Sequence, residues 1–472
     1  MHADVATKLK KQKYNKEAIK MLLNRKKNKE SHIKELKEQI YRLTWDYLYR
    51  FSKENEDNLV FSPLSVYTLL SMAADATAGK TKREIVDDLF NGIAPERALS
   101  ALSDLLQQVE AGDEFSDANA VMINESIKCS VQPNYPDHLK ELFRGELFSA
   151  NDMVPAVNSW VEKQTRGMIQ GIADDSMKEM LLCLINACSF IAKWKKEYEH
   201  YQVQNEDFHN SDGTDSRVRM LSSSEHTYFE NRNYIGFAKP YKGEQFAFVA
   251  LLPRDIGFTE GSFAALDLTE CLAGTENVIA RVLLPEFHCS SDFDLTDTLK
   301  EKGIRTIFTR QADFSPISSA WLKAEAIKHK AYIEVDRQGT KAAAVTSMMG
   351  FAGAALHDLP EVREVFLDRP FIYFIVHQDT GIPVFAGMIR HLDPLGDDED
   401  CLTDQEKEEL CKPVYDDICS TILDEDGILK DRYDRTLFRK AHEAYFRRDL
   451  ETLHHIVAEL EFDKAFNMQT DT

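Results

Sequence analysis

The alternation of apolar and polar positions divides the middle of the chain into strands and helices. Several apolar runs end at a proline or a glycine-containing turn, where sheet pairing stops because proline lacks an N–H donor. These runs predict strands at Phe246–Leu252, Val278–Leu284, Ala331–Asp336, Pro370–Val376 and Pro383–Ile389. The last two strands flank Asp379-Thr380-Gly381, a turn sequence that predicts a hairpin.

Two helices have clear start signals in the sequence. Ser62 followed by Pro63 predicts an N-cap with proline at the first helical position. Thr81, with Glu84 three residues later, predicts a second helix that begins in a capping box. Helices of this kind together with several strands predict an α+β fold, in which helices pack on large, mostly antiparallel sheets.

One segment does not follow either periodicity. Residues 337–369 follow a predicted strand and contain Gly339-Thr340, an alanine-rich run and then a stretch of small residues. A loop of 33 residues inside a folded domain is unusual and is typically functional. We therefore expect residues 337–369 to contain the functional loop.

Charge divides the chain into three zones. Residues 1–39 hold 12 basic and 5 acidic residues with apolar residues at helical spacing, which predicts a basic helical N-terminal extension. Residues 40–393 form the predicted main domain. From Asp397 onward the chain holds 22 acidic and 10 basic residues, and apolar positions between Phe438 and Leu460 repeat with a helical period. Residues 394–472 are thus predicted to be a small acidic, helical C-terminal extension.

Composition excludes several classes of function. A formal net charge of -22 argues against binding to nucleic acid or to an anionic membrane, and no apolar run is long enough for a membrane helix. The eight cysteines form no C-x-x-C pair and no zinc-site spacing, so we expect free thiols and no metal. Motifs of hydrolases, P-loop proteins, zinc proteases and dinucleotide-binding enzymes are absent, so we expect no enzymatic activity.

The lysine-rich start lacks the apolar stretch of a secretory signal. A cytoplasmic location is therefore expected for the sequence as given, and an extracellular one if its N-terminus is incomplete. We expect a monomer.

Twelve short motifs, in order along residues 58–371, resemble those of the serpin family. They are Asn58–Ser65, Ala78–Ile85, Asn158–Gly167, Asn186–Trp194, Pro240-Tyr241, Leu251–Pro253, Pro285–Phe287, Ala312–Ser315, His329–Ala331, Glu334-Val335, Gly339-Thr340 and Asp368–Phe371. Each motif is weak alone, but twelve in the family's order are specific. The two terminal extensions lie outside the family's pattern.

The resemblance implies the serpin fold, with helices packed on three mostly antiparallel sheets and an exposed reactive-centre loop. It implies a protease inhibitor whose cleaved loop inserts into the main sheet as a new strand. Heparin-type cofactors are common in the family, but residues 40–393 contain no clear basic stripe, so we expect no cofactor. The implied functional residues are a hinge (Gly339, Thr340, Ala342, Ala343, Ala344), a shutter (Ser62, Ser65, Asn186, His329) and a breach residue (Trp194).

The side chains of the loop fit an inserting strand. Alternate residues of a strand face the same side of a sheet, so the inward set would be Thr340, Ala342, Ala344, Thr346 and Met348. These side chains are uncharged, and most are small, so their burial is inexpensive. Arg337 and Lys341 are basic where many family members carry acids. The intact alternation favours an inhibitory serpin; the alternative is a non-inhibitory serpin that acts as a carrier, chaperone or interaction protein.

The family's usual spacing from Gly339 places the reactive bond at Gly353-Ala354, with Ala352 as an alternative register. Small side chains favour an elastase-like protease, whereas cleavage after Phe351 or Leu356 would favour a chymotrypsin-like one. A subtilisin-like protease is a further candidate partner. Because the loop is longer than in many family members, the sequence does not decide between these positions for the reactive bond.

The C-terminal extension contains a second, fainter resemblance. Residues Ala441–Leu450 resemble helices of bacterial J-domain-like proteins. The extension is expected to be a solvated helical pair or, alternatively, a module that binds another protein.

Overall fold

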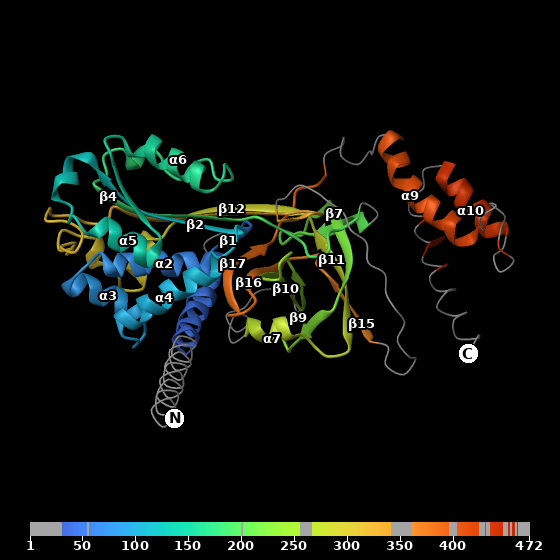
Figure 1. The fold of residues 1–472 in the computed structure, drawn as a ribbon, viewed down its shortest axis with the longest axis horizontal. Coiled ribbons are helices and arrows are strands. Elements are labelled where there is room, and N and C mark those ends of the chain that lie inside the picture. Colours follow the sequence, from blue (N-terminus) through green and yellow to red (C-terminus); the bar gives the residue numbers. More distant parts are fainter. Residues whose placement is uncertain are drawn as a thin grey trace, which may run out of the picture.

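The computed structural model describes residues 31–53, 56–199, 202–254, 267–340, 360–395, 404–423 and 435–446, together with 430, 452, 453, 456, 457 and 460. Three β-sheets and surrounding helices form the main domain (Figure 1), so the predicted α+β class is confirmed. The predicted hinge residues Ala342, Ala343 and Ala344 lie outside the described residues, as do all candidates for the reactive bond (Phe351, Ala352, Gly353, Ala354, Leu356).

The seven-stranded sheet is the longest layer in Figure 1 and carries Asn186, His329, Gly339 and Thr340 among the predicted functional residues. Its path is β3 (Glu146–Ala150), β2 (Phe115–Asn124), β4 (Leu182–Phe190), β13 (Ala326–Val335), β14 (Gly339–Thr340) and β5 (Ala192–Lys193), with β12 (Phe287–Asp294) paired to β13. The β2–β4 and β12–β13 pairs are antiparallel, whereas β4 and β13 are parallel.

The other two sheets complete the core. The six-stranded sheet has the order β1 (Leu59–Phe61), β17 (Ile382–Ile389), β16 (Phe371–His377), β10 (Phe246–Pro253), β9 (Tyr234–Pro240) and β8 (Thr227–Glu230). The four-stranded sheet has the order β15 (Glu361–Phe366), β11 (Val278–Pro285), β7 (Asp215–Glu225) and β6 (Val203–His209). The strands predicted before Pro253 and Pro285 and the β16–β17 hairpin are confirmed.

Helices cover both faces of the seven-stranded sheet. Figure 1 shows α6 on one face and the group α2 to α5 on the other. The α-helices are α2 (Pro63–Asp75), α3 (Gly79–Leu89), α4 (Pro95–Val109), α5 (Tyr135–Phe143), α6 (Met153–Gln164), α7 (Leu268–Ala273) and α8 (Thr296–Glu301). Short 3-10 segments occur at Glu125–Ser130, Asp175–Met177 and Thr306–Phe308.

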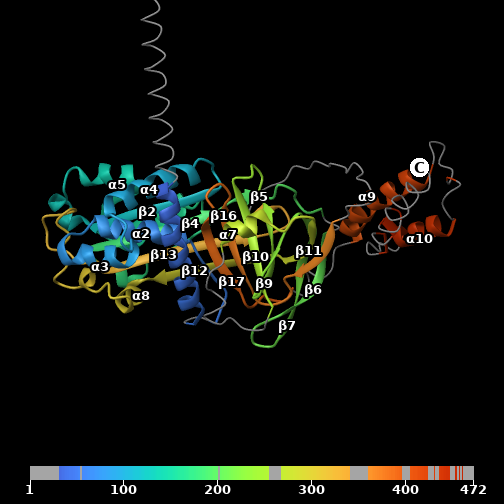
Figure 2. The same cartoon turned by 90° about the horizontal axis from the view of Figure 1, so that it is seen from below.

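A further helix over residues 31–53 runs through the boundary that the charge pattern predicted at residue 39. Its apolar face, from Leu36 to Phe51, is buried in the main core. Figure 2 shows this helix beside β16 and β17, and the ring of Trp45 lies 5.3 Å from that of Phe374 on β16. Residues 31–39 therefore pack with the main domain; they hold two basic and two acidic residues, unlike the basic segment before them.

Two local predictions need correction. The helix α3 begins at Gly79, so Thr81 lies inside it and does not cap it. The Thr81 hydroxyl instead accepts the N–H of Asp313, and Glu84 accepts the N–H groups of Arg305 and Thr306. Both side chains of the expected capping box thus bind backbone N–H groups that are distant in sequence and do not bind the start of the helix. The strand predicted from Ala331 begins five residues earlier, at Ala326, because both of its faces are covered and its polar residues are paired.

The C-terminal extension has its own apolar cluster. Residues of α9 (Asp404–Ile422) and α10 (Arg435–Phe446) pack with Leu453, Ile456 and Leu460. At its surface the rings of Tyr415 and Tyr445 stack at 4.5 Å, and the Tyr415 hydroxyl lies 2.7 Å from His442 Nδ1. The predicted helical character of this extension agrees with the structure.

The described cysteines are free thiols, and most of them are buried; Cys401 lies outside the described residues. Among the helices that the structure describes, none is long and apolar enough to span a bilayer. The described residues also contain no group of His, Cys, Asp or Glu side chains that could hold a metal ion.

Candidate functional site

The centre of the seven-stranded sheet contains a seam where β4 and β13 run in parallel. Their register pairs Ala326 with Cys183 at one end and Tyr332 with Ser189 at the other. A strand that entered between them in the opposite direction would form an antiparallel ladder with each neighbour, and antiparallel pairing is slightly more stable per residue. The chain that leaves β13 and turns back at Gly339 runs in that direction.

The short strand β14 already occupies the mouth of this seam. Thr340 pairs with Val335 of β13, and β14 pairs on its other side with β5, the continuation of β4. The Thr340 side chain is fully buried, and its Oγ1 lies 2.8 Å from the hydroxyl of Tyr241. The predicted hinge residues Gly339 and Thr340 therefore stand between the two halves of the sheet.

Gly339 is required by the local backbone. Its φ is +154°, and a Cβ at this position would lie 2.2 Å from the carbonyl oxygen of Ala192. Side chains at such a φ are strained, and no side chain fits against the neighbouring strand. This close approach lets β14 sit between β13 and β5.

Trp194 lies beside the hinge, where the resemblance placed the breach. Its indole stacks on Tyr241, with ring centroids 4.6 Å apart and an angle of 9° between the planes. The indole Nε1 donates to the carbonyl of Asp336, and the Trp194 N–H donates to that of Gln338. Trp194 thus holds the turn that leads from β13 into β14.

A buried ion pair supports this aromatic stack, and no sequence motif pointed to it. Lys239 on β9 and Glu225 on β7 are joined by an N–O distance of 2.7 Å, and both side chains are almost fully buried. The ammonium group also lies 4.3 Å from the ring centroid of Tyr198 and 5.5 Å from that of Trp194. A cation over aromatic faces is favourable, particularly where water is excluded. The breach is therefore tied to the four-stranded sheet.

Three of the predicted shutter residues meet beneath the seam. The backbone N–H of Ser62 donates to His329 Nε2 at 3.0 Å, and His329 Nδ1 lies 2.8 Å from Asn186 Oδ1. Because Nε2 accepts, Nδ1 carries the proton and donates to Asn186. Ser62 also caps α2, as predicted, since its Oγ accepts the N–H of Ser65. Ser65 contributes to the shutter through that backbone bond.

The hydrogen-bond chain continues to two residues that sequence reasoning missed. Asn186 Nδ2 donates to Asp117 Oδ1 at 2.6 Å and to Asn119 Oδ1 at 2.9 Å, and Asn119 Nδ2 donates to Asp117 Oδ2. Burial raises the pKa of the Asp117 carboxyl, and these amide donors counteract the rise. Along the chain of hydrogen bonds from Ser62 through His329 and Asn186, each donor is directed toward the Asp117 carboxylate. The sequence signal that could have identified Asp117 and Asn119 is their spacing, because an acid and an amide two residues apart lie on one face of an apolar strand.

The residues assigned to the hinge, breach and shutter all lie within the part of the chain that matches a known family. A family model described as serpin (serine protease inhibitor) matches residues 38–392. The chain belongs to the serpin family. The match covers the main domain and leaves out most of the N-terminal segment and the whole helical C-terminal extension.

Individual serpins support this assignment. An uncharacterized serpin-like protein of Thermococcus kodakarensis is 31% identical over 376 residues, which cover 77% of this chain and 87% of the relative. The crystal structure of tengpin, a thermophilic serpin in its native state, has a TM-score of 0.67 at 28% identity and covers 75% of this chain and 94% of tengpin. Human thyroxine-binding globulin complexed with thyroxine shares the fold, with a TM-score of 0.68 at 23% identity over 77% of this chain and 100% of that chain.

The shutter of this serpin is expected to make its stability depend on pH. Burial lowers the pKa of His329 to about 3, so the folded protein cannot take up the proton that an unfolded histidine binds below about pH 6.5. The contribution of neutral His329 to stability is therefore present above pH 6.5 and is lost as the pH falls toward 3. Between pH 7 and pH 5 the loss should be roughly 2 kcal/mol.

Urea unfolding of wild type and His329→Gln at pH 7 and pH 5 measures this contribution. Other titrating groups, including Asp117, affect both proteins alike, so the difference between the two pH slopes isolates His329. Equal slopes for the two proteins would show that His329 is not held neutral by the shutter.

Proposed function

We propose that this chain is an inhibitory serpin, a suicide substrate that traps a serine protease as an acyl-enzyme. The observation that carries the proposal is the parallel seam between β4 and β13 with β14 at its mouth. Insertion of the cleaved loop requires two neighbouring parallel strands that can separate, with the hinge leading directly to the point where they separate. Serpins target serine proteases in general.

The register at β14 supports insertion of the residues that follow. If the antiparallel pairing of Thr340 with Val335 is continued, each inward side chain of the loop meets a buried side chain of β13. The resulting pairs are Ala342 with Ile333, Ala344 with Ala331, Thr346 with His329, and Met348 with Ile327. This inward set is uncharged, so the ladder can extend through the shutter without burying a charge.

The two basic departures from the family's pattern each have an acidic neighbour. The backbone N–H of Arg337 donates to Glu286 Oε1 at 2.9 Å, and its guanidinium donates to the carbonyl of Tyr198. Lys341 would lie opposite Glu334 on the outward face in the same register. Opposite charges directly across a ladder are favourable. The charge changes are therefore compatible with insertion.

The chemistry of trapping follows from the protease's own mechanism. The protease serine Oγ attacks the carbonyl carbon of the scissile residue, and the C–N bond breaks as the new amine takes a proton from the catalytic histidine. The product is an ester between the protease and the serpin. Insertion of the freed strand would drag the protease across the serpin and distort its oxyanion hole, so that water no longer hydrolyses the ester.

The target class follows from the loop sequence. Cleavage at Gly353-Ala354 or after Ala352 fits an elastase-like pocket, and cleavage after Phe351 or Leu356 fits a chymotrypsin-like one. Subtilisin-like proteases accept both kinds of residue. We place Arg363 outside the set of reactive residues, because it lies in β15 and pairs with β11.

Incubation with a panel of elastase-, chymotrypsin-, subtilisin- and trypsin-like proteases tests the proposal. We expect one of the first three to give a complex with the summed mass of serpin and protease that survives boiling in detergent. Mass spectrometry of the released C-terminal peptide then identifies the reactive bond. Clean cleavage of the loop by every protease without a stable complex would instead favour the non-inhibitory alternative, a carrier, chaperone or interaction protein.

A further inference from the structure

Two large apolar side chains are exposed near the end of the seven-stranded sheet that lies opposite the hinge. Among the residues that the structure describes, the exposed side chains of this kind are Leu181 at 38%, Trp321 at 57% and Val362 at 62%. Leu181 immediately precedes β4, and Trp321 lies in the connection from α8 to β13. Val362 lies on β15, in the four-stranded sheet. Figure 2 shows α8 and β11, the partner of β15, toward opposite ends of the main domain.

Trp321 is held outward by a fixed backbone. Its indole Nε1 donates to the carbonyl of Arg310 at 2.9 Å, and the guanidinium of Arg310 lies 5.9 Å from the ring centroid. The segment that follows is anchored, because Leu322 and Ala324 are buried and the N–H of Ala324 donates to the carbonyl of Ile307 at 3.0 Å. The indole is therefore presented to solvent in one position.

The backbone of Leu181 is fixed on both sides. Its N–H donates to Glu325 Oε2, and its carbonyl accepts the N–H of Asn124 at 3.0 Å. The preceding residue, Met180, has its sulfur 3.3 Å from that of Cys183 on β4. Leu181 thus marks the start of β4 as Trp321 marks the approach to β13.

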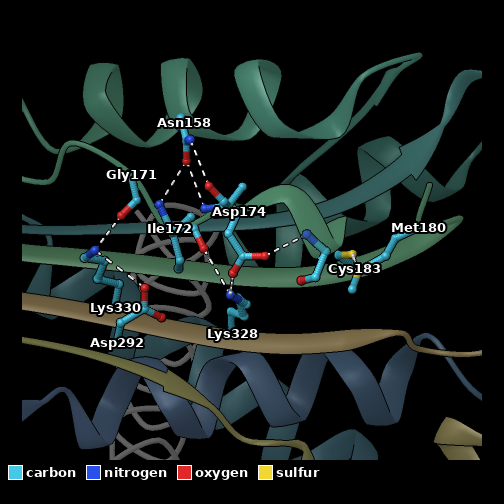
Figure 3. A network of polar contacts seen from close by, with 11 residues as sticks. Asn158, Gly171, Ile172, Asp174, Met180, Cys183, Asp292, Lys328 and Lys330 are labelled. Atoms are coloured by element: carbon cyan, nitrogen blue, oxygen red, sulfur yellow. Dashed lines mark hydrogen bonds and ion pairs between the residues drawn. The ribbon is translucent and has the colours of Figure 1, made fainter. Parts of the chain in front are cut away.

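The connection from α6 to Leu181 is also fastened to the sheet, as Figure 3 shows. On the outer face, opposite the shutter, Lys328 Nζ donates to the carbonyl of Ile172 at 3.2 Å. Lys330 Nζ donates to the carbonyl of Gly171 at 2.5 Å. Both sides of this end of the sheet are therefore rigid supports for an exposed apolar side chain.

The register at β14 brings the scissile residue to this end of the sheet. Continued pairing from Thr340 and Val335 places Met349 opposite Ala326, the first residue of β13. Residues 351–353 would then lie two to four residues beyond the ladder, or about 7–14 Å. Ala326 is the register partner of Cys183, so the inserted strand would leave the sheet between the starts of β13 and β4.

The two exposed side chains border this exit. Leu181 lies two residues before Cys183 on the β4 side. Trp321 lies five residues before Ala326 on the β13 side, and five residues span at most about 18 Å. An acylated residue at position 351, 352 or 353 would therefore arrive beside both of them.

We propose that Leu181 and Trp321 form a landing surface, which receives the acylated protease after insertion and slows hydrolysis of its ester. This inference rests on the proposed function. The ester joins the protease serine Oγ to the residue at the exit, so the active-site face of the protease faces this end of the sheet. A tether of about 7–14 Å is much shorter than a protease domain is wide, so that face rests on the side chains that border the exit.

Contact with the landing surface protects the ester through the requirements of hydrolysis. Water must add to the acyl carbon while the catalytic histidine takes its proton; the ester C–O bond then breaks and the serine oxygen takes the proton back. These steps need an ordered oxyanion hole and a water molecule at the bond. An apolar contact favours the displaced protease and excludes water. Hydrolysis therefore proceeds from the fraction of complexes in which the contact is broken.

The lifetime of the purified complex tests the landing surface. A complex with a protease from the panel is isolated, and the return of protease activity is followed with a fluorogenic substrate. We expect Trp321→Ser to release active protease about tenfold faster than wild type, because a large apolar contact is lost. Leu181→Ser should give about a threefold increase, since its side chain is smaller and less exposed.

Two further variants separate contact with the protease from a structural effect. Trp321→Phe lacks the hydrogen bond to Arg310 but keeps an apolar ring, so release should stay within about twofold of wild type. Val362→Ser is the matched control, because Val362 is at least as exposed but lies in the four-stranded sheet. It should release protease at the wild-type rate.

The outcomes separate the landing surface from the proposed function. If wild type forms no stable complex with any protease, the proposed function itself is wrong. If complexes form and Trp321→Ser, Leu181→Ser and Val362→Ser release protease at one rate, trapping stands and the landing surface is wrong. The same conclusion follows if Trp321→Ser lowers the yield of complex without shortening its lifetime. A dimer of intact wild type that Trp321→Ser converts into a monomer would assign the surface to a second copy of the chain and overturn the proposal.

Discussion

Cleavage of the serpin between residues 351 and 359, which leaves residues 340–350 attached to the hinge, is expected to raise its melting temperature by about 30 °C. Insertion of the cleaved segment replaces one parallel ladder with two antiparallel ones, a net gain of about ten backbone hydrogen bonds at roughly 1 kcal/mol each. Buried alanine, threonine and methionine side chains add to this gain. Because 1 kcal/mol shifts the melting temperature of a large domain by about 2 °C or more, the rise should reach tens of degrees.

The measurement compares intact and nicked protein by differential scanning fluorimetry or calorimetry. Nicking is done with a protease that is not trapped, followed by repurification. A protein nicked between residues 396 and 403, outside the main domain, is the control and should melt like intact protein. Identical melting temperatures before and after loop cleavage would contradict the stored strain on which the proposed mechanism depends.

Ala344→Arg should convert the proposed inhibitor into a substrate. In the register set by Thr340, residue 344 enters between Ala331 and Cys188, which are fully buried and lie side by side across the seam. A guanidinium group there would have no partner among these side chains, and burying an unpaired charge is unfavourable by several kcal/mol. We expect Ala344→Arg to lower the yield of stable complex at least a hundredfold, while the loop is cleaved at the normal rate.

Ala343→Arg provides the matched control. Residue 343 would face the other side of the sheet, opposite Tyr332, with Glu334 on the adjacent outward position. The arginine could then remain hydrated, so complex formation should stay within a fewfold of wild type. Both are measured as the molar ratio of serpin to protease that gives full inhibition. If the two arginine variants behave alike, the register deduced from β14 is wrong.

Local sequence patterns were sufficient for the elements that obey local rules. Proline after an apolar run located the ends of β10 and β11, and the turn at Gly381 located the β16–β17 hairpin. Ser62 was recognised as an N-cap because the capping bond forms within three residues. The capping role predicted for Thr81 was wrong, because its hydroxyl accepts the N–H of Asp313, which is distant in sequence.

Part of the candidate site could be predicted from the sequence. Gly339, Thr340, Trp194, Asn186 and His329 were found through family motifs, and the structure brings them to the seam between β4 and β13. The partners that complete the site could not be found in this way. Asp117 is 69 residues from Asn186, and Glu225 and Lys239 lie on different strands, so no local spacing relates these partners.

The sequence by itself determined the family, the α+β class and the alternation of the loop, because these depend on motifs and on the two-residue period of a strand. Only the tertiary structure decided the pairing of Thr340 with Val335, the direction of the shutter's hydrogen bonds and the outer contacts of Lys328 and Lys330. Each of these depends on which strands are neighbours and which face a helix covers. Neighbours in a sheet are chosen by burial of the whole core, so no segment read alone contains that information.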